Sequence, residues 1–164
     1  ALRLVKDDHE IALMRRAAAI SASAHRRAMD RTRAGWHEYQ VEAELVHEFL
    51  QNGAQAVAYP SIVAGGPNAC VLHYRDNNRQ VQDGELMLID AGCEFHGYAS
   101  DITRTFPVNG KFTGPQREIY ELVRRPSPIR GVILVLNWAI LVYLLRQALR
   151  EHRERVAATR QRVT

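Results

Sequence analysis

The chain has 164 residues, 46% of them hydrophobic and 24% charged, which is the composition of a globular protein long enough for one domain with a core. Cys70 and Cys93 are the only cysteines, so no disulfide framework is indicated and a reducing, cytoplasmic location is expected. The net charge of +4 is uneven, because residues 124–164 hold nine arginines and two glutamates, a net of +7, which leaves −3 for residues 1–123. A general affinity for nucleic acid is therefore not expected.

The first third of the chain predicts two helices. Residues 8–30 form the first, with Asp7 or Asp8 as its cap and Glu10 in its first turn. Its apolar residues recur at helical spacing, at Ile11, Met14, Ala18 and Ala22.

The second helix is predicted from about Glu38 to Gln51, with Gly53 as its stop signal. Its apolar stripe consists of Val41, Leu45, Val46, Phe49 and Leu50. Packing is the role expected of both apolar stripes.

From Ala54 the pattern changes to short β-rich runs. The stretch "AVAYPSIVAGGPNACVLHY", residues 56–74, predicts two short strands with a turn at "GGPN", and Asp83-Gly84 predicts another turn. Residues 86–106 then read as a hairpin, and a third helix is expected to begin near Thr113. Two helices, then strands, then a helix indicate an α+β fold.

The predicted hairpin, "LMLIDAGCEFHGYASDITRTF", carries one acid in each apolar run, Asp90 and Asp101. A turn centred on residues 95–96 places Asp90 opposite Asp101, whereas a turn centred on residues 96–97 places it opposite Thr103. Both registers put the two carboxylates on one face, within about 5–8 Å, and a loop with an odd residue count would separate them.

Two carboxylates on one half-buried face repel each other and lose hydration, so they need compensation. One of them can stay protonated, an arginine can lie between them, or a divalent cation can bridge them. Arg104 is the nearest arginine, but its alternation with Thr103 places it on the other face. Alternatively, one aspartate is only a turn or edge residue.

The residues around this pair carry a family resemblance. "LIDAGCEFHGYASDITRTFPVNGKFTGPQREIYELV", the upstream "GGPNACVLHY" and the two leading helices resemble bacterial Xaa-Pro aminopeptidase, a pita-bread metallopeptidase, over about residues 2–123. The resemblance implies that residues 1–123 are the N-terminal half of a pita-bread catalytic domain. It also implies release of the N-terminal residue from peptides with proline second. A prolidase-like dipeptidase is the alternative enzyme.

The resemblance also implies a metal site. In this family both aspartates belong to a two-metal centre, typically of manganese, that activates a hydroxide for attack on the scissile carbonyl. Asp90 would bind one metal and Asp101 would bridge both, while His73 would line the active site and help to bind substrate or stabilise the intermediate. Judged by its residue type alone, a histidine such as His73 near a strand is more often a hydrogen-bonded core residue.

The resemblance stops at about Val123, before the further histidine and two glutamates that complete the family's metal site. No part of residues 124–164 resembles that missing half, so the chain is expected to be truncated and to have little or no activity alone. A shifted reading frame, a fusion and a degenerate non-catalytic member are the accounts that fit this tail. The apolar run 131–145 is short for a membrane span, but membrane or partner binding by the tail, or a homo-oligomer, is compatible with it.

Overall fold

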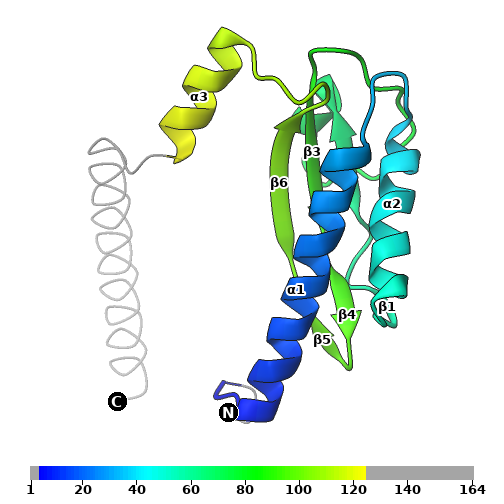
Figure 1. Ribbon diagram of the computed structural model, residues 1–164, viewed down its shortest axis with the longest axis vertical. Coiled ribbons are helices and arrows are strands. Elements are labelled where there is room, and N and C mark those ends of the chain that lie inside the picture. The colour runs from blue at the N-terminus through cyan, green and yellow to red at the C-terminus, as the bar shows by residue number, and fades with distance from the viewer. Residues whose placement is uncertain (1–3, 125–164) are drawn as a thin grey trace, which may run out of the picture. The chain divides into compact units, whose positions relative to one another are not determined.

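The computed structural model describes residues 4–124 (Figure 1). Its helices are α1 (Asp8–Arg31), α2 (Glu38–Gln51), the short 3-10 helix η1 (Gly66–Cys70) and α3 (Gly114–Arg124). Its strands are β1 (Ala56–Val57), β2 (Ile62–Gly65), β3 (Leu86–Ala91), β4 (Cys93–Phe95), β5 (Tyr98–Ala99) and β6 (Ile102–Pro107). The predicted α+β class is confirmed. The chain divides into two compact units after Thr113, so α3 is described by itself.

Helix α1 begins at a reciprocal cap, as its sequence predicts. The Asp7 side chain accepts from the Glu10 N–H, and the Glu10 side chain accepts from the Asp7 N–H. The predicted apolar face is wrong, because Met14 and Ala18 are exposed. The buried residues lie elsewhere on the helix, at Ala17, Ile20, Ser21, Ala24, His25 and Ala28. Four alanine or serine side chains among them allow close approach to the neighbouring elements.

Helix α2 has the predicted bounds. The Gln40 side chain accepts from the His37 N–H at its start, and Gly53 follows its end with φ +85. Only part of the predicted stripe is buried, at Val41, Leu45 and Phe49. Leu50 is exposed, so the buried stripe of this helix is narrower than the sequence indicates.

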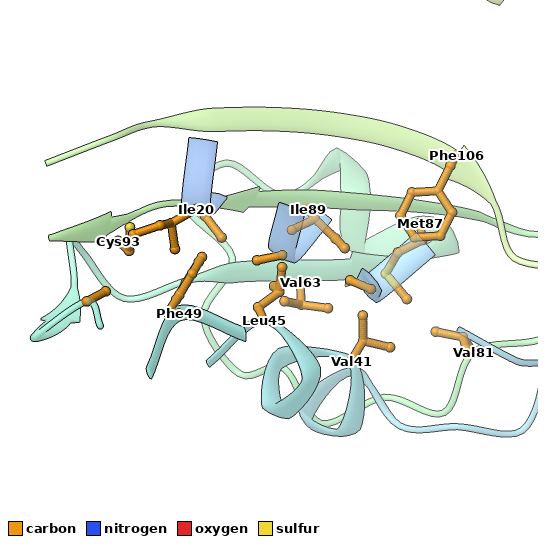
Figure 2. Close-up of a cluster of buried hydrophobic side chains, with 14 of the residues drawn as sticks. Ile20, Val41, Leu45, Phe49, Val63, Val81, Met87, Ile89, Cys93 and Phe106 are labelled. Atoms are coloured by element: carbon orange, nitrogen blue, oxygen red, sulfur yellow. The ribbon is translucent and has the colours of Figure 1, made fainter. Parts of the chain in front are cut away.

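Two antiparallel sheets contain the strands, in the orders β2-β3-β6 and β1-β4-β5. Along β3 the buried residues alternate, and Met87, Ile89 and Ala91 join the core beneath α1 and α2 (Figure 2). Leu86, Leu88 and Asp90 are half-buried and point to the other face. The helices therefore cover one face of β2-β3-β6 (Figure 1).

The hairpin that begins at β3 has the second of the two predicted registers. Asp90 pairs with Thr103, and Phe95 pairs with Tyr98 around a two-residue turn. His96 and Gly97 form that turn with φ +50 and +81, as the favoured hairpin turn requires.

The strand expected after "GGPN" is absent from the described residues. Instead η1 occupies residues 66–70, and residues 71–79 contain no strand. The backbone N–H groups in this region donate to side-chain oxygens and not to the carbonyl groups of a neighbouring strand. Glu38 accepts from the N–H groups of Gly65 and Arg79, and Asn77 accepts from that of Val63.

Within residues 4–124, no helix is both long enough and apolar enough to cross a membrane. The apolar run 131–145 and almost all of the basic tail 124–164 lie outside the described residues, so their predicted properties stay predictions.

Candidate functional site

The structure brings the two predicted aspartates together. Asp90 lies in β3 on the face turned away from the helices, and Asp101 lies one residue before β6. Asp90 is half-buried and Asp101 is exposed. Both carboxylates reach the same hydroxyl group, so they lie on one side of the strand pair, as the register argument predicts.

That hydroxyl belongs to Tyr59, between β1 and β2. Its oxygen lies 2.7 Å from Oδ1 of Asp90 and 2.9 Å from Oδ1 of Asp101. Because a hydroxyl carries one hydrogen, it donates to one carboxylate at a time, and the two carboxylates compete for it. Without a metal ion, Tyr59 therefore partly compensates the repulsion between the two acids.

The environment of Tyr59 favours its neutral form. Burial raises the pKa of its phenol well above the usual value, and the hydrogen bonds to Asp90 and Asp101 and their negative charges raise it further. Tyr59 thus stays a donor rather than adding a third negative charge. Sequence reasoning missed this residue, because nothing in "AYPS" indicates that its side chain reaches a hairpin about 30 residues later.

His73 lines the same pocket as Asp90. A pocket of about 310 Å³ is lined by His73, Asp90 and Thr103, together with Ile62, Ala69, Cys70, Val71, Leu72 and Leu88. The His73 side chain is exposed, so the alternative of a core histidine is wrong. Most of the lining residues are apolar, and Asp90, Thr103 and His73 add a few polar groups, a combination that is typical of ligand sites.

A second histidine supports the backbone next to Asp90 from the core side. Nε2 of buried His25 lies 3.1 Å from the carbonyl oxygen of Ala91, so this nitrogen carries the hydrogen. Nδ1 of His25 has no hydrogen-bond partner among the described residues. Burial lowers the pKa of His25, and the charge of Arg104 lowers it further, against the opposing effects of the Ala91 carbonyl and Asp90.

The donor set fits part of a metal site. Two carboxylates that converge on one point are the oxygen ligands that hard divalent cations prefer. Among residues 4–124, however, no group of three or more His, Cys, Asp or Glu side chains could hold a metal ion. The described residues therefore offer two converging carboxylates and not a complete metal site.

Comparisons with known proteins identify the family. The sequence model of metallopeptidase family M24 matches residues 12–126. The chain belongs to this family. Among curated proteins, the Xaa-Pro aminopeptidases of Haemophilus influenzae and Escherichia coli are 58% and 57% identical over 122 residues, or 74% of this chain. The chain spans 28% of the length of each of these relatives.

Solved structures of this family agree with the fold. Zinc-substituted aminopeptidase P of Escherichia coli, in complex with product, has a TM-score of 0.73 at 56% identity. Proline aminopeptidase P II of Yersinia pestis has the same TM-score at 58% identity. Each match covers 74% of this chain and 28% of the solved chain. The α+β fold described above is thus part of the pita-bread fold of aminopeptidase P.

Proposed function

We propose that this chain carries the N-terminal part of the catalytic centre of an Xaa-Pro aminopeptidase. The observation that carries the proposal is the convergence of Asp90 and Asp101 on the Tyr59 hydroxyl. The high identity to named Xaa-Pro aminopeptidases supports the substrate class, a peptide with proline in second position. Asp90 and Asp101 are the proposed metal ligands, and His73 is the proposed substrate-side residue.

The bound metal, for which manganese is proposed, would supply an activated nucleophile and would polarise the scissile carbonyl. This chain's own residues would bind the metal and contact the peptide on one side of the centre. Asp90 and Asp101 would place negative charge on one side of β3 and β6, and Tyr59 would orient their oxygens by donating one hydrogen bond. His73 would contact the peptide from the wall of the pocket.

A second function is supported by the missing third ligand. Two carboxylates without further ligands among residues 4–124 suit a chain that binds a partner and performs no chemistry alone. Activity in a complete domain separates the two functions, because a non-catalytic remnant has no need to keep working ligands.

The experiment is a segment exchange. The 122-residue segment of the Escherichia coli Xaa-Pro aminopeptidase that matches this chain is replaced by the chain's own residues. The hybrid should release the first residue of an Arg-Pro-Pro peptide. Asp101→Ala should lower its activity more than about 100-fold, since even groups that only support a ligand cost 10–100-fold.

Two further variants make the exchange specific. His73→Ala should lower activity while the metal content stays unchanged, and Tyr39→Phe on the exposed side of α2 should leave activity intact. A folded hybrid without activity, or one in which Asp101→Ala is silent, would refute the proposed function.

A further inference from the structure

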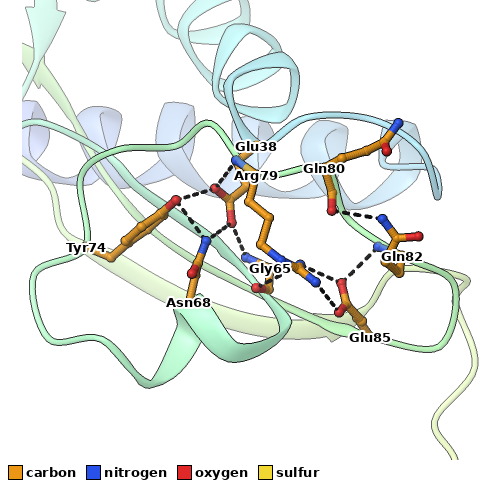
Figure 3. Close-up of polar contacts among 8 residues, drawn as sticks. All are labelled: Glu38, Gly65, Asn68, Tyr74, Arg79, Gln80, Gln82 and Glu85. Atoms are coloured by element: carbon orange, nitrogen blue, oxygen red, sulfur yellow. Dashed lines mark hydrogen bonds and ion pairs between the residues drawn. The ribbon is translucent and has the colours of Figure 1, made fainter.

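Glu38 is a buried charge that the proposed metal site does not use. It is the first residue of α2, and its exposed fraction is 0%. Its Oε1 accepts from the Gly65 N–H at 2.7 Å and from Nδ2 of Asn68 at 3.0 Å. Its Oε2 accepts from the Tyr74 hydroxyl at 2.7 Å and from the Arg79 N–H at 2.9 Å (Figure 3). Four donors therefore compensate the burial of this carboxylate.

Three of these donors lie in one segment, residues 66–79, which we name the pocket loop. Gly65 immediately precedes the loop, Asn68 lies in η1, Tyr74 lies in the middle and Arg79 ends the loop. A single side chain thus fixes the loop at its start, middle and end (Figure 3). The residues between Asn68 and Tyr74 are those that line the pocket beside Asp90.

His73 stands at a position that needs such support. Its φ is +55, a left-handed conformation that is uncommon for residues other than glycine. Residues persist in such conformations when their surroundings hold them there. The next residue, Tyr74, is buried, and its hydroxyl donates to Glu38 while accepting from Asn68 at 2.8 Å.

The end of the loop is closed by a second contact. The Arg79 guanidinium forms two hydrogen bonds with the Glu85 carboxylate, at 2.6 and 2.8 Å, and a longer one with the Gly65 carbonyl (Figure 3). This ion pair lowers the pKa of Glu85 and raises that of Arg79, so both groups stay charged. The carboxylate of Glu38 is therefore part of a continuous polar network that joins α2, the pocket loop and the approach to β3.

We propose that Glu38 is a positioning residue, whose carboxylate fixes the pocket loop and thereby places His73 beside Asp90. The proposal rests on the proposed function in one respect, since it takes this pocket to be the substrate pocket. The order of the loop can be measured without any activity, so failure of this proposal is distinguishable from failure of the proposed function.

Glu38→Gln tests the carboxylate with almost no change in shape. The amide of glutamine would point two hydrogens at groups that are themselves donors. If it replaces Oε1, it faces the Gly65 N–H and the Asn68 amide, and if it replaces Oε2, it faces the Arg79 N–H. Tyr74→Phe removes one of the four hydrogen bonds to Glu38, together with the one that Asn68 donates to the Tyr74 hydroxyl, and serves as the milder variant.

Glu44→Gln is the matched control. Glu44 lies on the same helix, but it pairs with Arg27 at 2.7 Å and with Arg31 at 3.5 Å, away from the pocket loop. Its replacement removes a carboxylate and weakens α1–α2 contacts. It therefore shows how a loss of stability affects the loop when the hydrogen bonds of Glu38 stay intact.

The measurement uses the full chain and a spin label on Cys70, which is exposed in the pocket loop while Cys93 is buried. Hydrogen exchange of the Gly65 and Arg79 amides is followed in parallel. Glu38→Gln should increase label mobility and accelerate exchange at these amides at least about tenfold, as expected for the loss of a hydrogen bond to a charged group. Tyr74→Phe should mobilise the label less, and Glu44→Gln not at all. In Glu38→Gln the acceleration of exchange at Gly65 and Arg79 should exceed that at the β3 amides, which report global unfolding.

Two results would overturn the proposal. One is a folded Glu38→Gln chain, or a folded Tyr74→Phe chain if the former does not fold, with an unchanged label spectrum. The other is equal mobilisation by Glu44→Gln, which would show that general destabilisation and not the Glu38 carboxylate controls the loop.

Discussion

The Tyr59 hydroxyl is the group on which the aspartate pair depends in the metal-free chain. It reaches both Asp90 and Asp101, and no other side chain among residues 4–124 donates a hydrogen bond to either carboxylate. A half-buried carboxylate that loses its donor keeps its desolvation cost. The free energy of unfolding measured without metal therefore reports the contribution of Tyr59.

Tyr59→Phe should destabilise the full chain by about 1–2 kcal/mol, because it removes a hydrogen bond to a charged acceptor and leaves the repulsion of the pair uncompensated. Urea denaturation without metal measures this. Tyr39→Phe, at a side chain that is 52% exposed, is the control and should change stability little. A Tyr59→Phe chain as stable as the wild type would show that the pair is compensated in another way.

His25 gives the fold a dependence on pH. Its folded-state pKa lies below the usual value, chiefly because of burial, so protonation favours the unfolded chain. Its contribution to stability is therefore complete above the unfolded pKa of about 6.5 and is lost as the pH falls toward the folded pKa.

We expect the free energy of unfolding of the wild type to fall between about pH 7.5 and about pH 5 more steeply than that of His25→Gln, which has no charge to gain. Denaturant titrations at the two pH values give the slopes. Equal slopes for the two chains would contradict the assignment of a buried neutral histidine at this position.

At the scale of elements, the joint between β3 and β4 is a single residue, Gly92. A Cβ atom at this position would stand 1.7 Å from the Ser100 carbonyl oxygen, which is backbone and cannot rotate away. Gly92 also accepts a hydrogen bond from the Ala58 N–H at 2.8 Å. The hairpin that carries both aspartates therefore needs glycine here.

Gly92→Ala should destabilise the chain by at least about 3 kcal/mol, well above the effect of an average substitution, because the two strands must separate. Gly114→Ala, where a Cβ meets nothing within 4 Å, is the control and should be nearly neutral. Thermal unfolding of both variants is the measurement. A Gly92→Ala chain of ordinary stability would mean that the hairpin can shift without loss.

The sequence predicts these elements where local signals agree. The bounds of α2 follow from short-range rules. The same rules narrow the α1 cap to Asp7 or Asp8, and they allow the even-numbered hairpin loop without requiring it. The same rules do not predict which face of α1 is buried or how the pocket loop folds, because both depend on contacts with residues far away in the sequence. Glu38 replaces a strand partner for residues that lie between 27 and 41 positions away, and no spacing rule reveals this.

At the scale of the whole molecule, the proposed function assigns one side of a catalytic centre to the described residues. The aspartate pair and the pocket with His73 are present, and a third metal ligand is absent from residues 4–124. The relatives are more than three times as long as the matched segment, which covers 28% of them. The complete centre is thus expected only when further ligands are supplied.

The isolated chain with added manganese should release no detectable first residue from an Arg-Pro-Pro peptide, because the two carboxylates found among residues 4–124 cannot hold two ions in a defined geometry. Its melting temperature should rise little, since stabilisation by metal follows RT ln(1 + [L]/Kd) and the affinity is low. Robust turnover that Asp101→Ala abolishes would instead reveal a complete site, for example in a homo-oligomer.

The manganese content of the hybrid enzyme, determined after dialysis by atomic emission, tests most directly whether Asp90 and Asp101 bind metal. We expect the hybrid to bind manganese and Tyr39→Phe to retain it. Asp90→Asn and Asp101→Asn should each lower the bound amount and weaken affinity at least about 100-fold. A hybrid that folds without binding manganese, or a double variant of Asp90 and Asp101 that binds as much as the unmodified hybrid, would contradict the assignment of these two ligands.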